Sequence, residues 1–347
     1  MDDHADGGPS PPRRHWTMEE FAEAAGVSRP TVSKYFNDPD SVRPASRQRI
    51  RDAMREFGYQ PNLFAVNFNR RSTKTIGIVV PSLTDPFYAE VVRWVELGAL
   101  GAGYWSIVLS SHADPALEVR ALQVLDSIKV AGVLIAPLGN GAPPRHRETR
   151  APTVYLDSRM DGDGCFVGTD NARSFEQMVE YLCRTGEPPC FVAMPEVNRN
   201  AQERRDAFTA AMGRRGLAPV VLEPARHGWA FEEIGHETAT RAIDAGGFPS
   251  RTVLCANDRL AFGAMAAATE RGLRVGRAPG CDLRLAGHDD HPLSRFTCPS
   301  LTTMAQDYAG IARAGLSSLL AQALPGTERR PDRVQLLDAK LMMRDSA

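Results

Sequence analysis

The chain has 347 residues, of which 43% are hydrophobic, and its 41 Lys and Arg against 42 Asp and Glu give a net charge of -1. A chain of this length is too long for one ordinary core, so we expect two or three domains. No apolar run approaches the ~20 residues that span a bilayer, so no membrane-spanning segment is expected. The six cysteines include no CxxC pair, so zinc and disulfide frameworks are not expected either.

Residues 1–15 are rich in Pro, Gly and charge. They offer too little apolar surface for packing, so we expect a disordered leader. The segment also lacks the apolar stretch of a secretory signal. With cysteines that we expect to be reduced, this favours a cytoplasmic protein.

Residues 17–37 predict two short helices joined by a glycine turn. Apolar residues recur at helical spacing in the first helix, so one face is buried while the glutamates stay in water. Gly26 permits the left-handed backbone at which a helix stops sharply. Ser28 is a good N-cap and Pro30 is tolerated in a first turn, so a second helix begins at about Arg29.

The second helix carries polar side chains on the face opposite Val32 and Phe36. Arginine can read guanine edges with two hydrogen bonds, and Ser, Thr and Lys can hold phosphates. An ordinary helical hairpin inside a larger domain is the alternative interpretation. The residues expected to face DNA are Ser28, Arg29, Thr31, Ser33 and Lys34, with Thr17 and Asn37 fixing the DNA backbone.

Residues 43–62 predict a third amphipathic helix whose buried stripe is Ile50, Met54 and Phe57. Together with the helix pair it would complete a small headpiece over residues 16–61. Between residues 13 and 74 the chain has 12 Lys and Arg but only seven Asp and Glu. This local excess of positive charge suits a phosphate-binding face on an otherwise near-neutral protein.

Residues 62–74 are polar and basic, and we interpret them as a linker. From Thr75 onward, short apolar runs typical of buried parallel strands alternate with helical stretches. This alternation favours doubly wound α/β structure, with room for two such units. Strands are predicted at 75–82, 105–111, 130–137, 152–157, 189–194 and 251–258, and helices at 86–103 and 117–129.

Five segments of the sequence carry a resemblance to the lactose-repressor (LacI/GalR) family of bacterial transcription regulators. They are AGVSRPTVSKYFN at 25–37, FGYQPN at 57–62, KTIGIVVPSLTDPFYAE at 74–90, ANDRLAFGAM at 256–265 and AGHDD at 286–290. The resemblance implies an α/β protein with an N-terminal three-helix helix-turn-helix headpiece. It also implies a bilobed body, like that of periplasmic sugar-binding proteins, made of two doubly wound parallel-sheet subdomains. The N-lobe would comprise about 75–170 and 305–335, and the C-lobe about 171–304 and 336–347.

In the resembling family the linker becomes a hinge helix, which enters the minor groove when two subunits meet on an operator. Phe68 stands where the family usually has a leucine. Phenylalanine is among the apolar wedges that proteins insert between base steps, so Phe68 is a candidate wedge. The alternative is that Phe68 packs against the body of the protein.

Polar residues follow several of the predicted strands. In open α/β sheets ligands bind beyond the carboxyl ends of strands, and carboxylates and amides there can exchange hydrogen bonds with a ligand's hydroxyl groups. Helix N-capping is the alternative role for Asp and Asn at such positions. The candidates are Asp85 with Phe87, Asp157, Asn257 with Asp258, and Asp289.

The resemblance assigns effector binding to Asp85, Asp157, Asn257 and Asp289, although the family has asparagine where this chain has Asp85. It adds Arg204, which aligns with an arginine that commonly anchors the effector. It also adds Trp229, where many members place a ring that stacks on the ligand. Trp229 could equally be an ordinary surface or core ring. The family habit favours a sugar or sugar derivative as the effector, with nucleobases second.

We do not expect an enzyme, because the sequence contains no recognisable set of catalytic residues, and no cofactor is expected. The string from His288 to His291 looks like a metal cluster. Adjacent residues of an extended segment point to opposite faces, however, so we expect no metal site. The chain ends close to where the family's core ends, without a further heptad helix, so we expect dimers.

The sequence therefore predicts a cytoplasmic transcription repressor that binds double-stranded operator DNA as a homodimer. Its affinity for the operator would be controlled by a carbohydrate-like effector bound between the two lobes. The alternative is a cytoplasmic small-molecule binding protein without DNA-binding activity.

Overall fold

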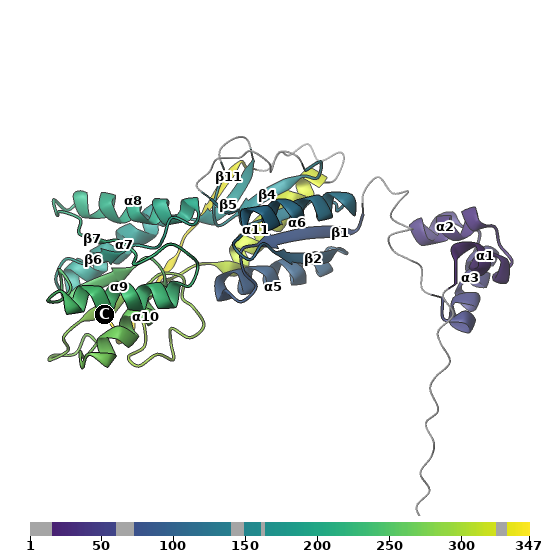
Figure 1. The fold of residues 1–347 in the computed structure, drawn as a ribbon. Helices are drawn as coiled ribbons and strands as arrows, with labels where there is room; N and C mark the ends of the chain where they lie inside the picture. The colour runs from purple at the N-terminus through teal and green to yellow at the C-terminus, as the bar shows by residue number, and fades with distance from the viewer. Residues whose placement is uncertain (1–15, 60–72, 140–148, 161–163, 324–331) are drawn as a thin grey trace, which may run out of the picture. The chain divides into compact units, whose positions relative to one another are not determined.

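The computed structural model describes residues 16–59, 73–139, 149–160, 164–323 and 332–347 (Figure 1). The chain divides into two compact units, Met1–Thr73 and Lys74–Ala347. The predicted leader and Phe68, with most of the predicted linker, lie outside the described residues.

The first unit contains the predicted helix, glycine turn and second helix, followed by the predicted third helix. A short 3-10 turn separates the second and third helices. The elements are α1 at Met18–Ala24, α2 at Arg29–Asn37, η1 at Pro39–Ser41 and α3 at Pro44–Phe57.

Side-chain caps fix where α1 and α2 begin. At α1, the Thr17 hydroxyl accepts a hydrogen bond from the Glu20 N–H, and the Glu20 carboxylate accepts one from the Thr17 N–H. Gly26 has a φ of 61°, the left-handed conformation that turns the chain between the helices. At α2, the Ser28 hydroxyl accepts from the Thr31 N–H at 3.4 Å. The predicted helix boundaries at Gly26 and Ser28 are therefore confirmed.

The third helix is shorter than predicted, because α3 ends at Phe57 and does not reach residue 62. Gly58 has a φ of 61°, and a left-handed residue at this position stops a helix. The chain turns back there, so Tyr59 is buried and its ring stacks on Phe21 with centroids 3.8 Å apart. Ile50 is fully buried beside them, whereas Phe57 is only half-buried.

The second unit has two lobes, each built on a parallel sheet. In the N-lobe the strand order is β11-β5-β4-β3-β1-β2, and each neighbouring pair is parallel. The strands are β1 at Thr75–Val80, β2 at Trp105–Ser110, β3 at Val133–Ile135, β4 at Thr153–Leu156, β5 at Cys165–Thr169 and β11 at Val334–Leu337. The helices of this lobe are α5 at Pro86–Gly101, α6 at Pro115–Ser127 and α11 at Tyr308–Ala323.

The alternation of side chains along β1 explains the layers of the N-lobe. Ile76 and Ile78 point to one face and pack with residues of α5 and α11. Val79 points to the other face and packs with Leu122 and Leu125 of α6. Helices therefore cover both faces of the sheet, as Figure 1 shows.

In the C-lobe the strand order is β7-β6-β8-β9, again with parallel neighbours. α9 and α10 cross closely, because Gly235 and Gly263 leave room for the backbone of the facing helix. The strands are β6 at Cys190–Val192, β7 at Val221–Leu222, β8 at Thr252–Cys255 and β9 at Arg284–Ala286. The helices are α7 at Asn171–Thr185, α8 at Arg199–Gly213, α9 at Phe231–Asp244 and α10 at Asp258–Glu270.

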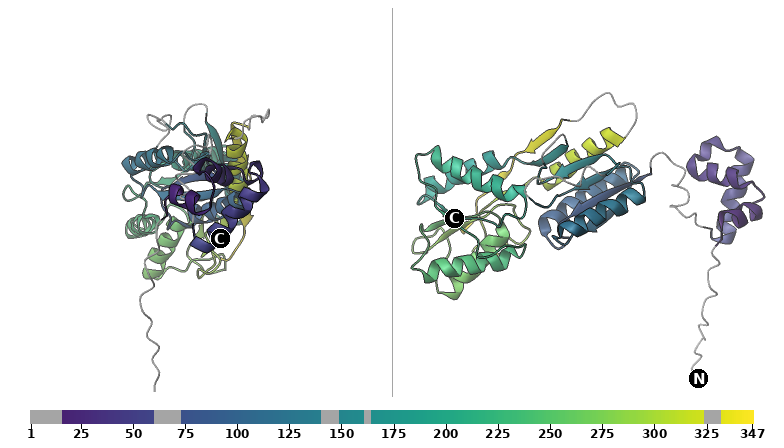
Figure 2. Two further views of the ribbon diagram at one scale, coloured as in Figure 1. Left: turned by 90° about the vertical axis from the view of Figure 1, so that its right-hand side faces the viewer. Right: turned by 45° about the horizontal axis from the view of Figure 1, so that its top comes forward.

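The chain passes repeatedly between the lobes. It leaves the N-lobe after β5, returns after β9 to form α11 and β11, and passes back to end in the core of the C-lobe at Ala347. The last strand, β12 at Lys340–Met342, pairs antiparallel with β10 at Thr303–Ala305. Figure 2 shows the C-terminus beside the C-lobe. Among the described helices, none has the length and hydropathy needed to cross a membrane.

Candidate functional site

A narrow pocket with a cavity volume of about 30 Å³ lies where the two lobes face each other. Its N-lobe side is formed by residues that follow β1 and β4. Its C-lobe side is formed by the N-terminal parts of α8, α9 and α10 and by the segments after β6 and β9. The pocket thus lies beyond the carboxyl ends of strands from both sheets, where open α/β folds bind ligands.

The structure brings the seven residues predicted for effector binding to this one pocket. They are Asp85, Phe87, Asp157, Arg204, Trp229, Asn257 and Asp289. Their part in binding an effector stays a prediction, but their convergence gives the pocket a mixed lining of carboxylates, amides, guanidinium and aromatic rings.

Arg204 and Asp289 form a buried ion pair on the C-lobe wall. The Arg204 side chain is only 3% exposed, and its Nη2 donates to Asp289 Oδ1 at 2.8 Å while its Nη1 donates to the Ala256 carbonyl at 2.7 Å. Burial by itself raises the pKa of Asp289, but the Arg204 guanidinium and the His288 hydrogen bond bring it below its ordinary value. Asp289 is therefore ionised at neutral pH.

His288 forms a hydrogen bond with the same carboxylate. Burial lowers the pKa of this imidazole to about 4, so the ring is neutral at pH 7. Its Nδ1 then donates to Asp289 Oδ1 at 3.1 Å, and its Nε2 accepts from the Ser174 hydroxyl at 2.7 Å. The Gln306 amide also donates to Asp289 Oδ1, at 2.7 Å. Asp289 Oδ1 is thus fully used, whereas Asp289 Oδ2 has no hydrogen-bond partner in the described part of the chain.

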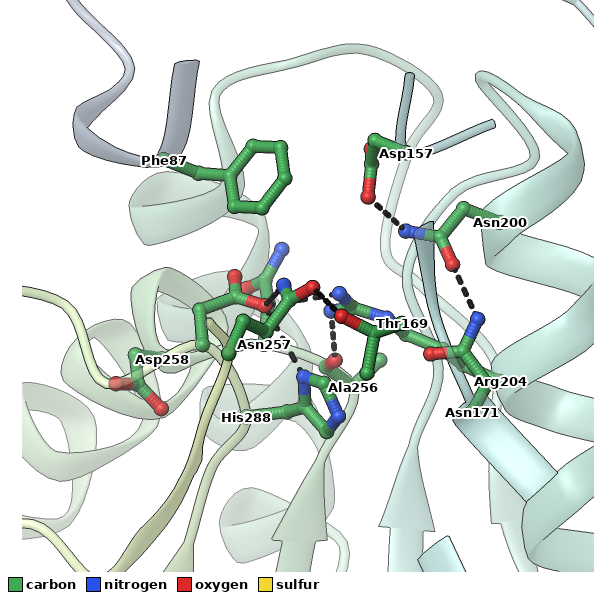
Figure 3. A network of polar contacts seen from close by, with 12 residues as sticks. Phe87, Asp157, Thr169, Asn171, Asn200, Arg204, Ala256, Asn257, Asp258 and His288 are labelled. Carbon is green, nitrogen blue, oxygen red and sulfur yellow. Dashed lines mark hydrogen bonds and ion pairs between the residues drawn. The ribbon is translucent and has the colours of Figure 1, made fainter. Parts of the chain in front are cut away.

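Asp157 lies on the N-lobe wall and contacts both lobes. Its Oδ1 accepts from the Asn200 amide at 3.0 Å, and its Oδ2 accepts from the Tyr88 hydroxyl at 3.2 Å. Figure 3 shows the chain of contacts that continues from Asn200 to Asn171. Burial raises the pKa of Asp157 to about 7, against the opposing attraction of Arg204. Its charge therefore changes near neutral pH.

Asp85 and Arg259 form a second ion pair, which joins the lobes. Asp85 precedes α5 of the N-lobe, and Arg259 lies in the first turn of α10 of the C-lobe. Arg259 Nη1 donates to Asp85 Oδ2 at 2.8 Å, and the same guanidinium donates twice to Glu232, at 2.7 Å each. Burial raises the pKa of Asp85, and the attraction of Arg259 offsets only part of that effect.

Aromatic rings complete the lining. The Tyr88 ring of the N-lobe lies 6.4 Å from the Trp229 ring of the C-lobe, and Trp229 in turn lies 5.6 Å from Phe231. Phe87 contacts both Tyr88 and Tyr308 edge to face. Trp229 is half-buried against residues of both lobes, so it is neither a free surface ring nor a fully buried core ring.

The capping alternative describes part of the set correctly. Asp85 caps α5 through the Phe87 N–H at 3.0 Å, and Asn257 caps α10 through the Leu260 N–H at 2.8 Å. Each caps a helix and still lines the pocket, so the two roles are compatible. Asn257 uses its amide oxygen for the cap, and its amide nitrogen has no partner among the described residues.

Asp258 does not line the pocket, since it is buried behind it. Its carboxylate accepts from the Ser294 and Thr303 hydroxyls at 2.6 Å each and from the His291 N–H at 2.8 Å. Burial raises its pKa to about 7. These bonds hold α10 against the segment after β9, so the role of Asp258 is structural and it does not contact the pocket.

The residues from His288 to His291 have separate surroundings. His288 and Asp289 face the cleft network, Asp290 accepts from Arg344 Nη2 at 2.6 Å, and His291 lies edge to face against the Phe262 ring. No group of three or more His, Cys, Asp or Glu that could hold a metal ion occurs in the described ranges.

Several pocket residues were missed by the sequence analysis. Asn200 lies one helical turn before Arg204, so helical spacing could have placed it in the pocket. Tyr88 adjoins the predicted Phe87, but sequence alone gave no sign that it turns toward Asp157. Arg259 follows Asn257 by two residues, and its link to Asp85 spans 174 positions of sequence.

Among the predicted DNA-facing residues, Thr17 caps α1, Ser28 caps α2, and Arg29, Thr31, Ser33, Lys34 and Asn37 belong to α2. Arg29 and Lys34 are exposed, and Thr31 and Ser33 are half-buried. The hydroxyls of Thr17 and Ser28 serve as helix caps, and those side chains are still exposed. Asn37 ends α2, but its side chain, like the whole of Phe68, lies outside what the structure describes.

The sequence is similar to known bacterial regulators. Residues 17–62 match the family described as bacterial regulatory proteins, lacI family, and residues 188–347 match the periplasmic binding protein-like domain. The HTH-type transcriptional repressor CytR of Escherichia coli is 29% identical over 336 residues, which cover 95% of this chain and 96% of CytR.

Solved structures share the fold. The lac repressor dimer bound to operator and the anti-inducer ONPF gives a TM-score of 0.81 at 25% identity, over 96% of this chain and 99% of that chain. The transcriptional regulator CelR in complex with cellobiose gives a TM-score of 0.66 at 25% identity, over 95% of this chain and 99% of that chain.

Proposed function

The chain belongs to the lacI family of bacterial regulatory proteins and is a DNA-binding transcriptional repressor, and from this premise we propose how its parts act. In this proposal the protein is a cytoplasmic homodimer. The exposed face of α2 binds operator DNA, and an uncharged, hydroxyl-rich small molecule binds in the cleft and sets the affinity for the operator.

The DNA-binding part of the proposal is supported by the exposed cations of α2. Arg29 Nε lies 2.7 Å from Glu19 Oε1, and both side chains are more than 60% exposed, at 64% and 63%. Such a surface ion pair contributes little to stability, so Arg29 can leave Glu19 to bind a guanine edge or a phosphate. Lys34 is exposed on the same helix and can neutralise a DNA phosphate.

The proposed class of ligand is supported by polar groups of the cleft that have no hydrogen-bond partner within the described residues. Asp289 Oδ2 is an acceptor, and the amide nitrogens of Asn257 and Asn198 are donors, and none of the three is hydrogen-bonded within the described residues. Acceptors and donors that line one pocket suit hydroxyl groups, which act as both. The apolar face of a sugar ring can pack on Trp229. The complex of the related CelR with cellobiose agrees with a carbohydrate-like ligand.

The charges of the cleft favour an uncharged effector. The guanidinium of Arg204 is paired with Asp289, and that of Arg259 is paired with Asp85 and Glu232. A phosphate group in the cleft would have to break one of these pairs and leave a buried carboxylate uncompensated, which is costly.

The bonds between Asp85 and Arg259 and between Asp157 and Asn200 suggest how a ligand would change DNA affinity. Each bond joins the N-lobe to the C-lobe across the pocket. A ligand that exchanges hydrogen bonds with these groups changes the free energy of the closed lobe arrangement. That is a differential interaction with two states, as an allosteric shift requires.

The homodimer is supported by large apolar side chains on the surface of the second unit. Leu97 of α5 and Trp105 of the edge strand β2 are 54% and 68% exposed on the N-lobe. Phe296 is 72% exposed on the C-lobe. Exposed apolar groups of this size are typical of protein interfaces, and a second copy of the chain would cover them.

The proposal is tested by gel-shift assays of the dimer with DNA from upstream of its own gene. Arg29→Ala should weaken binding roughly tenfold to a hundredfold, because one base-reading or phosphate contact is worth ~1–3 kcal/mol. Arg55→Ala is the matched control, since Arg55 is 78% exposed on α3 and forms only a loose pair with Asp52 at 3.7 Å. A carbohydrate screen by thermal shift should then find a ligand that stabilises wild type and Arg29→Ala equally, by about 2.7 kcal/mol at 100 times its dissociation constant.

Two results would contradict the assignment of the DNA face. One is the lack of any salt-dependent binding to that DNA, because phosphate contacts make binding fall steeply with salt. The other is an equal loss of affinity in Arg29→Ala and Arg55→Ala.

A further inference from the structure

A second pocket, with a cavity volume of about 290 Å³, lies on the C-lobe at the end of the sheet opposite to the cleft. Thr252 is the first residue of β8 and Arg284 is the first residue of β9, so this pocket adjoins the strands where they begin. The loop 276–283, with Gly186, Glu187 and Arg251, forms the rest of the wall. We name this site the arginine pocket, because Arg251, Arg277 and Arg284 all line it.

Arg284 is a cation with weak compensation. Its Nη2 donates to the Thr185 hydroxyl at 2.6 Å, but its Nη1 reaches Thr252 Oγ1 and the Leu182 carbonyl only at 3.4 Å each. Its Nε is buried without a hydrogen-bond partner. Burial lowers the pKa of Arg284, which reflects a charged group held in a partly desolvated site. No carboxylate of the described residues forms an ion pair with it.

Among the described residues, the Arg251 guanidinium is also hydrogen-bonded to uncharged groups only. Its Nη2 and Nε donate to the carbonyls of Cys281 and Asp282, at 2.6 and 3.2 Å, so the guanidinium holds the loop beside Arg284. Its side chain has no carboxylate partner within the described ranges. Two guanidinium groups therefore line one concave site with only carbonyl and hydroxyl oxygens as partners.

The carboxylates of the pocket are already engaged with backbone donors. Glu187 accepts from the Arg251 N–H at 3.1 Å, and Asp282 accepts from the Arg274 N–H at 2.8 Å. Arg277, at the rim, is 57% exposed and lies 3.9 Å from Asp345, which is at the limit of an ion pair. The lining therefore has more cations than anions, and its cations retain unused donors.

We propose that the arginine pocket binds the phosphate group of a small metabolite, as a ligand site separate from the cleft. A guanidinium presents planar pairs of N–H donors that match phosphate oxygens, and Arg251 and Arg284 provide two of them around one cavity. The cleft differs in this respect, because its guanidinium groups are paired with carboxylates. The two sites therefore take ligands of different charge.

Calorimetric titration of the full-length protein at constant ionic strength tests the proposal, with inorganic phosphate and glycerol 3-phosphate as probes and glycerol and acetate as controls. Both phosphates should bind with one site per chain, and glycerol and acetate should not. Arg284→Gln should weaken the binding of both phosphates about tenfold, since a charge-assisted hydrogen bond is lost. Arg184→Gln, which removes a 77% exposed arginine at the end of α7, should leave it unchanged. Arg29→Ala should also leave it unchanged, which separates this site from the DNA-facing cations.

Two further variants keep the test decisive if Arg284→Gln fails to fold. Gly186→Ala retains every charge, but a Cβ there would overlap Arg284 Nη1 and displace the guanidinium, so it should weaken phosphate binding. Arg277→Gln removes a rim cation with little structural role and should weaken it severalfold. Non-saturable binding, or equal affinity in Arg184→Gln, Gly186→Ala and Arg277→Gln, would mean an adventitious ion only and would overturn the proposal.

Discussion

The ion pair between Asp85 and Arg259 predicts an unequal response to removing its two members. The Asp85 side chain is 8% exposed and that of Arg259 is 18% exposed. In Arg259→Gln, Asp85 keeps the Phe87 N–H but loses its cation, and an uncompensated buried charge costs about 3–5 kcal/mol. Because the pair is not fully buried, we expect a loss of about 3 kcal/mol in the free energy of unfolding.

The reverse substitution should be mild. In Asp85→Asn, the Arg259 guanidinium keeps both bonds to Glu232, and the new amide oxygen can still cap α5. We expect a loss of about 1 kcal/mol, which is the value of one hydrogen bond. Arg271→Gln is the matched control at the end of the same helix, where the partner Asp244 is 61% exposed and the pair should contribute little.

The response to pH gives this prediction a second readout. The pKa of Asp85 is already raised by burial, and losing Arg259 raises it further. When a carboxyl group has a higher pKa in the folded state than in the unfolded state, the protein loses stability as pH rises from the unfolded pKa to the folded pKa. The deficit of Arg259→Gln should therefore be larger at pH 8 than at pH 5, by about 1.4 kcal/mol for each unit of added shift within that range.

Urea denaturation followed by far-UV circular dichroism, at pH 5 and at pH 8, measures all of these quantities. The reasoning fails if Asp85→Asn costs as much as Arg259→Gln. It also fails if the deficit of Arg259→Gln is the same at both pH values.

Two further predictions concern Asp157 and the crossing of α9 and α10. The charged and titratable groups that face Asp157 are Tyr88, Asp85, Asp289 and Arg204. Burial is the main reason that the pKa of Asp157 is raised to about 7, so this residue destabilises the folded state as pH rises from about 4 to about 7. Asp157→Asn removes this loss, so the stability of the variant relative to wild type should increase between pH 5 and pH 8 in urea titrations. A difference that stays constant with pH would contradict the prediction. Asp258 also has a pKa of about 7, but it contributes equally in both proteins and cancels. Gly263→Ala places a Cβ against the Glu232 carbonyl and the His236 backbone, so thermal unfolding should show a loss of about 1–3 kcal/mol in the free energy of unfolding from overpacking. In the control Gly213→Ala, at the end of α8, the added Cβ meets no atom within 4 Å, so this change should be neutral or slightly stabilising. Equal effects of the two alanines would show that the close crossing is not what Gly263 permits.

Several of the strands that could be predicted from sequence are buried on both faces, although the partly exposed edge strand β2 was predicted as well. β1, β3 and β8 lie inside their sheets, so their apolar runs are nearly continuous and stand out. The strands that were not predicted, such as β7 at Val221–Leu222 and β12 at Lys340–Met342, are short and partly exposed. Their strand conformation depends on pairing with distant residues, which no local pattern reports.

The cleft residues that follow strands were predictable because parallel strands end at a common edge, and Arg204 and Trp229 were predicted from the family resemblance. Asn200 and Arg259, which bond to Asp157 and Asp85, were not predicted. Asp157 follows β4, and so its position could be inferred from the strand alone. Its hydrogen bond to Asn200 depends on how the C-lobe meets the N-lobe, 43 positions further along the chain. The same holds for Arg259, which sequence would place on the surface of a helix. Contacts between lobes are set by packing of whole domains, and local propensity does not encode them.

The arrangement of charge in the cleft limits what any ligand can gain there. Asp85 and Asp157 belong to the N-lobe, and their partners Arg259 and Asn200 belong to the C-lobe. A ligand that binds these groups exchanges one set of hydrogen bonds for another, so its net effect on lobe closure is a small difference between large terms. Coupling energies of about 1–3 kcal/mol are typical of allosteric proteins, and exchange of this kind supplies energies of that size. Both bonds join the same two lobes, so a relative movement of the lobes would change them together, which would suit switching between two arrangements better than gradual adjustment.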